Sequence, residues 1–293
     1  MTSALRPGEN HLDARPQDPP SMDANHPNYA PISPPSPALT ALAPGVWYAL
    51  GLIALYFALQ LSVAAVIGLA AGLVALAQHG GDVTSIITSG RAWLAHSDAS
   101  AIAVIATLLV AAAAILHLVR RWWPQLWAKA ELPGFGFAMS KQPAMYLLAL
   151  VLGLATPFVG GMLTQWVAQG HEVSQDIKQL GAHISLPLRI PLALLVVSIG
   201  PLVEELLFRG VLLSSIARYV GSGWAIVVTA IFFACVHLPD LSFLWYALPN
   251  LALLGLLLGW LRVQSGSIWP AVLAHSMNNL LAVVSWFVMT SAS

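Results

Sequence analysis

Long apolar runs recur along most of this 293-residue chain. Each run holds roughly 20 residues, the length of helix that crosses about 30 Å of hydrocarbon. In a bilayer core only helices and closed barrels satisfy their own backbone hydrogen bonds. The runs are continuous, whereas barrel strands alternate apolar and polar residues over about ten positions. The sequence therefore predicts an all-α fold, a polytopic transmembrane helical bundle.

The composition excludes several other classes of protein. Hydrophobic residues make up 58% of the chain and charged residues only 8%, whereas a soluble domain carries about 25% charged residues. A soluble enzyme, a disordered protein and a nucleic-acid binder are thereby excluded. The first expected partner is the lipid bilayer. The single cysteine, Cys235, excludes an internal disulfide.

The chain divides into three regions. Residues 1–45 hold ten of the twenty prolines and too little apolar surface to offset the entropy of ordering, so they are predicted to form a disordered tail. Residues 46–189 contain the N-terminal membrane helices, followed by a polar surface link at 169–189, and residues 190–290 form the core. About seven to eight spans are expected. The seven counted lie near 46–77, 100–119, 144–168, 190–217, 223–238, 241–261 and 267–290.

The basic residues predict an orientation, because cytoplasmic loops are enriched in Lys and Arg. With a cytoplasmic N-terminus, eight basic residues fall inside: Arg6, Arg15, Arg120, Arg121, Lys129, Lys141, Arg218 and Arg262. Three fall outside: Arg91, Lys178 and Arg189. We therefore expect a multi-pass protein of the cell (inner) membrane with a cytoplasmic N-terminus.

Only three charged residues lie deep in an apolar span, and all three are in the same one: Glu204, Glu205 and Arg209. A charge at a helix centre costs about 2.5–3.5 kcal/mol on insertion scales, so such residues face a protein interior or a wet cavity. Glu205 and Arg209 are four residues apart and are expected to pair. Glu204 lies about 100° further round the helix and has no obvious local partner.

Two histidines also lie deep in apolar spans. His237 is near the end of the fifth span, and His275 is in the seventh. His275 and Asn279 are four residues apart, so they share a helix face and offer a suitable donor pair for a developing oxyanion. A single intramembrane histidine is more often a satisfied core residue than a catalyst. The joint pattern with Glu204 is much harder to explain by packing alone.

These residues form three motifs: Glu204-Glu205-x-x-x-Arg209, Phe233-x-x-x-His237 and His275-x-x-x-Asn279. Together, and in this order, they resemble the motifs of the CAAX-processing and bacteriocin-processing (CPBP, or ABI) family of intramembrane glutamic endopeptidases. Eukaryotic members of that family cleave prenylated CAAX proteins. The resemblance covers about residues 190–290.

The resemblance implies a peptidase and a role for each motif residue. Glu204 would be the general base that activates water, and His237 would hold and polarise that water. His275 and Asn279 would stabilise the oxyanion. Glu205, Arg209 and Phe233 would support them. The implied substrate is a membrane-associated or prenylated peptide, and no cofactor is implied.

Three alternatives stay open. Glu204, His237 and His275 form a conceivable zinc site of two histidines and one carboxylate, although no local metal-ligand motif supports it. The same polar residues would also suit a catalytically inactive membrane scaffold or a bacteriocin-immunity protein, because a fold does not determine function. A proton-coupled transporter is the third alternative, disfavoured because the sequence shows no internal repeat.

Overall fold

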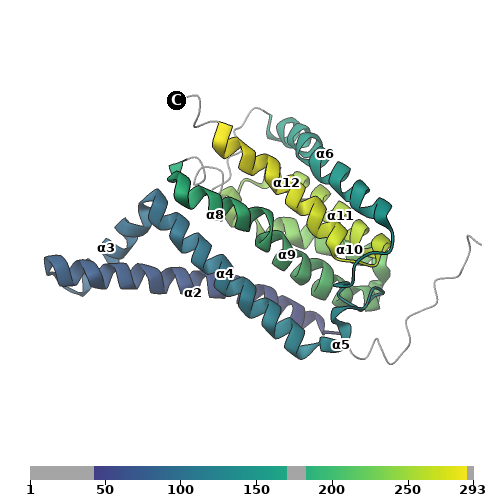
Figure 1. Ribbon diagram of the computed structural model, residues 1–293, viewed down its shortest axis with the longest axis horizontal. Coiled ribbons are helices and arrows are strands. Elements are labelled where there is room, and N and C mark those ends of the chain that lie inside the picture. Colours follow the sequence, from purple (N-terminus) through teal and green to yellow (C-terminus); the bar gives the residue numbers. More distant parts are fainter. Residues whose placement is uncertain (1–42, 170–182, 289–293) are drawn as a thin grey trace, which may run out of the picture. The chain divides into compact units, whose positions relative to one another are not determined.

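The computed structural model describes residues 43–169 and 183–288, and these residues form helices and no strands. Figure 1 shows the helices of this all-α fold. They are α2 (Val46–His79), α3 (Val83–Ala95), α4 (Ser97–Trp122), α5 (Pro124–Trp127), α6 (Pro143–Ala168), α8 (Leu186–Val197), α9 (Ile199–Glu205), a π-helical segment (Leu206–Leu212), α10 (Leu213–Val236), α11 (Leu248–Ser265) and α12 (Trp269–Val288), with 3₁₀ turns at Pro239–Leu241 and Trp245–Ala247. Most of the predicted tail (residues 1–42) and most of the 169–189 link (residues 170–182) lie outside the described residues.

Six helical stretches among these residues are long and apolar enough to cross a membrane. Their outward faces carry large apolar side chains: Leu61, Met162 and Trp166 are each more than 70% exposed in the absence of lipid. Apolar surface of this extent on a monomer marks contact with another apolar phase. The chain is therefore an integral, multi-pass membrane protein.

The first expected span is one uninterrupted helix. Helix α2 has 34 residues, which at 1.5 Å per residue is about 51 Å long. Helix α3 packs along its second half, where a Cβ atom on Gly72 would lie 2.0 Å from the Ile86 carbonyl oxygen and one on Gly90 would lie 2.2 Å from the Gly68 carbonyl oxygen. Small residues permit this close approach of two backbones.

The longest apolar stretch, Leu186–Val236, has 51 residues and contains two of the expected spans. Gly221 interrupts it with φ 76° and ψ 167°, a conformation that glycine adopts without steric cost. The rings of Phe208 and Phe233 lie only 5.2 Å apart, whereas an unbroken helix would separate these residues by about 37 Å. The chain therefore reverses at Gly221, and the two arms pack against each other.

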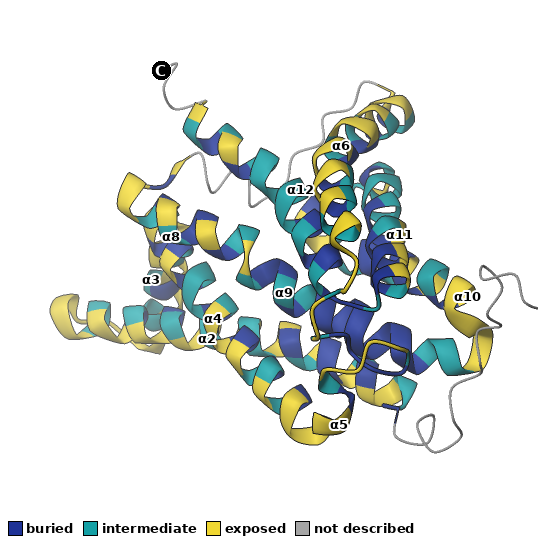
Figure 2. Cartoon of the chain, turned by 45° about the vertical axis from the view of Figure 1, so that its right-hand side comes forward, coloured by how far each residue is buried: buried dark blue, intermediate teal, exposed yellow. Residues whose placement is uncertain are grey.

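Buried residues concentrate around α9 and the π-helical segment, with exposed residues on the outward faces of α2, α6 and α10 (Figure 2). Two glycines allow the surrounding helices to approach closely. A Cβ atom on Gly255 of α11 would lie 2.9 Å from Ala230 of α10, and one on Gly153 of α6 would lie 2.4 Å from the Ala274 carbonyl oxygen of α12. Of the two glutamates of α9, Glu205 is fully buried among these closely packed helices, whereas Glu204 is partly exposed.

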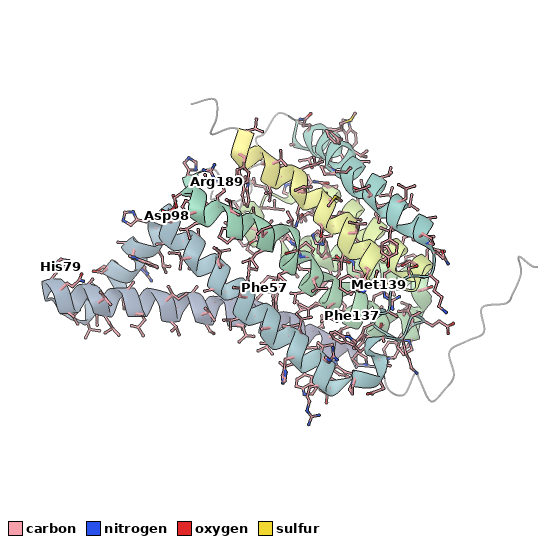
Figure 3. All side chains as sticks on the ribbon, in the orientation of Figure 1. Phe57, His79, Asp98, Phe137, Met139 and Arg189 are labelled. Carbon is pink, nitrogen blue, oxygen red and sulfur yellow. The ribbon has the colours of Figure 1, made fainter. Side chains whose placement is uncertain are left out.

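Helix α12 is fixed at both ends. At its start, Trp269 donates from Nε1 to the Phe137 carbonyl oxygen at 2.9 Å, and the Phe137 ring stacks on Trp127 with centroids 3.8 Å apart. At its other end, Arg189 of α8 donates to the Trp286 carbonyl oxygen at 3.0 Å. Figure 3 labels Phe137 at the first of these ends and Arg189 at the second. These contacts set the position of His275 and Asn279 along the helix.

Candidate active site

The two adjacent glutamates lie at the end of α9, directly before the π-helical segment Leu206–Leu212. Segments of π-helix are rare and occur frequently at functional sites. Successive residues point about 100° apart around a helix, and the two carboxylates accordingly lie in different surroundings. The Glu205 side chain is fully buried, whereas the Glu204 side chain is 23% exposed.

Glu205 is the centre of a sealed cluster. Its Oε1 accepts hydrogen bonds from Arg209 Nη1 at 2.8 Å and from His275 Nδ1 at 2.9 Å. Arg209 also donates from Nη2 to the Gly255 carbonyl oxygen at 3.2 Å, and its guanidinium lies 4.5 Å from the Phe233 ring centroid. The expected Glu205–Arg209 pair is present. It also reaches α11 through Gly255 and α12 through His275.

Glu204 lies on the open side of the same helix and faces two imidazoles. Its Oε2 is 3.9 Å from His237 Nε2 and 3.7 Å from His275 Nε2. Both separations are too long for direct hydrogen bonds, which end near 3.2 Å. The three side chains come from α9, from the end of α10 and from α12, so the fold brings together the acid and the two histidines that the sequence singled out.

The ring of His237 is held in one orientation. Its Nδ1 lies 2.7 Å from the Phe233 carbonyl oxygen, and because a carbonyl oxygen only accepts, Nδ1 carries the hydrogen. In the neutral imidazole Nε2 then has a free lone pair directed towards Glu204. The ring also packs against Phe233, with centroids 4.6 Å apart. Phe233 therefore contacts both Arg209 and His237, which links the sealed cluster to the open side.

Asn279 lies one turn beyond His275, and its side chain contacts α8 and the neighbouring Asn278. Its Nδ2 donates to the Val196 carbonyl oxygen at 3.0 Å, and its Oδ1 accepts from Asn278 Nδ2 at 3.2 Å. Val196 lies at the C-terminal end of α8, where helical carbonyls lack intrahelical partners. An amide nitrogen carries two hydrogens, so Asn279 Nδ2 retains a second donor.

Several site neighbours carry no signal in the sequence. The carbonyl oxygens of Gly255 and Val196 are backbone acceptors, which residue types do not reveal. Tyr56 of α2 is buried and close enough to Glu204 to interact with its charge. From the sequence alone, Tyr56 cannot be distinguished from an ordinary interfacial or core tyrosine. Only the packing of α2 against the C-terminal helices identifies it.

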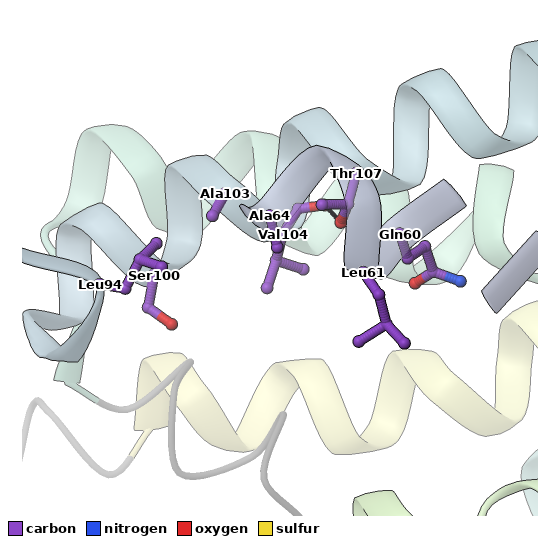
Figure 4. A pocket seen from close by; sticks show the side chains of 8 residues that line it. All are labelled: Gln60, Leu61, Ala64, Leu94, Ser100, Ala103, Val104 and Thr107. Carbon is purple, nitrogen blue, oxygen red and sulfur yellow. Dashed lines mark hydrogen bonds between the residues drawn. The ribbon is translucent and has the colours of Figure 1, made fainter. Parts of the chain in front are cut away.

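The described residues contain neither a recognisable metal cluster nor a motif residue in the pocket between α2, α3 and α4. Within residues 43–169 and 183–288, no group of three or more His, Cys, Asp and Glu side chains has the arrangement of a metal site. A pocket of about 300 Å³ lies between α2, α3 and α4 (Figure 4). It is lined mainly by apolar side chains, and none of the residues of the three motifs contributes to it.

Apolar spanning helices that surround an acid and two histidines define the class: an integral membrane protein with a polar cluster between its helices. Residues 186–281 match the family model described as Rce1-like, Type II CAAX prenyl endopeptidase. This segment includes every residue of the three motifs and is similar to the CAAX prenyl endopeptidases. No curated protein and no solved structure matches the chain.

Proposed function

We propose that this protein is an intramembrane glutamic endopeptidase. The observation that carries the proposal is the position of Glu204 Oε2, within 4 Å of the Nε2 atoms of both His237 and His275. Hydrolysis of a peptide bond needs a base, an attacking water and an oxyanion site. The cluster offers side chains for the first and third, and a place for the second between Glu204 and His237.

The attacking water donates one hydrogen bond to Glu204 Oε2 and the other to the lone pair of His237 Nε2. Glu204 accepts a proton as the water oxygen forms a bond to the carbonyl carbon, and the carbonyl π electrons move to its oxygen. When the tetrahedral intermediate collapses, the C–N bond breaks and Glu204 returns the proton to the leaving amine.

The oxyanion is stabilised from α12. His275 donates from Nε2, and Asn279 donates its second N–H. His275 already directs Nδ1 to Glu205, so donation from both nitrogens requires the imidazolium form. Arg209 and the imidazolium then balance the charges of Glu204 and Glu205. The sealed cluster thus acts as a support that holds His275 in position.

The substrate proposed is a membrane-associated peptide, with a prenylated CAAX sequence as the first candidate because the matching family model is described as a CAAX prenyl endopeptidase. The reaction is proposed to need no cofactor. Zinc bound by Glu204, His237 and His275 is the alternative mechanism. Loss of cleavage in a chelator, restored by added zinc, would replace the metal-free mechanism with the zinc one.

The test compares the full chain with its Glu204→Gln variant in detergent. The probes are an internally quenched peptide ending in a farnesylated CAAX sequence and a mixed library of membrane-segment peptides, with products identified by mass spectrometry. General-base catalysis contributes about 10²–10⁴-fold, so Glu204→Gln should lower cleavage by that factor. Glu131→Gln, in the exposed connection between α5 and α6, is the matched control.

Equal cleavage by the wild type and Glu204→Gln would remove Glu204 from the mechanism. If the wild type cleaves neither probe while remaining folded, the peptidase proposal fails. The inactive scaffold would then become the better assignment.

A further inference from the structure

A second pocket, of about 560 Å³, lies where α2 begins and α4 ends, and the proposed peptidase does not use it. Among its lining residues are Tyr48, Arg121, Trp122 and Trp123, and none of them is acidic. We propose that this pocket binds the phosphate headgroup of an anionic phospholipid.

Two guanidinium groups give the pocket its charge. Arg121 lines it directly. Arg218, from the first arm of the reversed helix, reaches the edge of the pocket. Its Nη2 lies 3.8 Å from the position that a Cβ atom would take on Gly45, which lines the pocket. Guanidinium groups bind phosphate oxygens well because their planar donors match the geometry of the anion.

Neither arginine is neutralised within the described part of the chain. The ion pairs found there involve Arg209, His237 and His275, but neither Arg121 nor Arg218. The Arg218 Nε is buried without a hydrogen-bond partner, and its guanidinium is steadied by the Tyr219 ring at 4.6 Å. The terminal Nη donors of a half-buried guanidinium that has no ion pair in the described residues are suited to an external anion.

The aromatic residues around the pocket place it at the level of lipid headgroups. Tyr48 and Trp122 are exposed, and Tyr219 is exposed beside Arg218. All three lie at the ends of apolar helices, and tryptophan and tyrosine at such positions sit at the membrane–water interface. A phosphate bound there would belong to a lipid whose acyl chains run along the apolar helix surfaces.

The same end of the bundle carries most of the remaining positive charge. Arg120, Lys129 and Lys141 are exposed near it. The other end has exposed Arg91 and a buried Arg189. The enrichment of cytoplasmic segments in basic residues makes the pocket end the cytoplasmic one, and anionic lipids attract basic sites at that surface.

The test measures lipid binding by the full chain in nonionic detergent. Dioleoylphosphatidylglycerol and dioleoylphosphatidylcholine are titrated separately, with retained lipid counted by native mass spectrometry and the midpoint of thermal unfolding followed in parallel. Phosphatidylglycerol should bind more tightly and raise the midpoint. Arg121→Gln and Arg218→Gln should each weaken its binding about fivefold, and the double variant should bind the two lipids nearly equally.

Arg91→Gln, at the opposite end, is the matched control and should keep the preference for phosphatidylglycerol. Soluble glycerol 3-phosphate is the second probe and should leave the midpoint unchanged. Equal binding of the two lipids by the wild type would overturn the proposal, as would an undiminished preference in the double variant. Stabilisation by glycerol 3-phosphate to the same extent as by the lipid would identify a site for a soluble anion instead.

If the double variant fails to fold, the single variants and the two lipid titrations of the wild type still decide the question. Peptide cleavage is not the readout, so these results are independent of the proposed peptidase. A loss of lipid preference with intact cleavage, or the reverse, separates the two proposals.

Discussion

The two glutamates at the end of α9 are neighbours in the chain but differ in every other respect. Glu205 is fully buried and accepts two charge-assisted hydrogen bonds from Arg209 and His275. Glu204 is partly exposed and has no partner within direct hydrogen-bond distance in the described structure. A buried carboxylate whose Oε1 is bound by two donors from different turns and helices is suited to fixing helices, whereas one without a direct hydrogen-bond partner beside polar neighbours is suited to proton transfer.

His275 joins the two environments. One ring nitrogen contacts Glu205 on the sealed side, and the other faces Glu204 on the open side. Any change in the sealed cluster is therefore expected to reach the open side through the orientation of this ring. The glutamate suited to fixing the helices and the glutamate suited to proton transfer thus lie on different faces of α9, and His275 lies beside both of them.

The largest loss of stability, and the clearest difference between the two glutamates, is expected from Arg209→Met. Removal of one partner of a buried pair leaves the other charge uncompensated, at a cost of about 3–5 kcal/mol. The free energy of unfolding, measured by denaturation in mixed micelles, should fall by that amount. Glu204→Gln in the same assay should change it by less than about 1 kcal/mol, because Glu204 makes no direct hydrogen bond and its replacement leaves no buried partner unpaired. Similar losses for both variants would break the distinction.

The next effect is expected from Asn279→Ala. Loss of one oxyanion donor lowers kcat by about 10²–10³-fold with little change in KM. The lost bond to the Val196 carbonyl oxygen should lower the free energy of unfolding by only about 1 kcal/mol. The kinetic measurement uses the peptide cleaved by the wild type. An unchanged kcat would restrict Asn279 to linking α12 to α8.

The smallest effect is expected from Gly153→Leu in α6. A Cβ atom there would lie 2.4 Å from the Ala274 carbonyl oxygen, so the larger side chain must displace α12 next to His275. Overpacking of this kind costs about 1–3 kcal/mol, and cleavage should fall with it. Gly161→Leu in the same helix is the control, because nothing lies within 4 Å of its Cβ position. Equal behaviour of the two variants would show that the open side tolerates movement of α12.

The sequence predicted the parts of this molecule that depend on local spacing. Helical geometry predicted that Glu205 pairs with Arg209, and it separated Glu204 from that pair. The apolar runs predicted spanning helices, including the separation of 190–217 from 223–238 that the reversal at Gly221 confirms. In each of these cases one helix or one glycine determines the outcome.

Other parts were not predictable because they depend on contacts between distant helices. Nothing local indicates that Arg209 donates to the Gly255 carbonyl oxygen or that Asn279 donates to that of Val196. The convergence of Glu204 with His237 and His275 was an expectation from the family resemblance, and spacing along the chain could not have produced it. The π-helical form of Leu206–Leu212 likewise has no signature in residue type.

The reversal at Gly221 has a consequence for the surrounding lipid. Its second arm, residues 222–236, rises only about 22 Å, well short of a hydrocarbon layer about 30 Å thick. Such hydrophobic mismatch is accommodated by local thinning of the bilayer. His237 ends this short arm, so local thinning of the membrane beside it is expected to open a route for solvent to the proposed hydrolytic site.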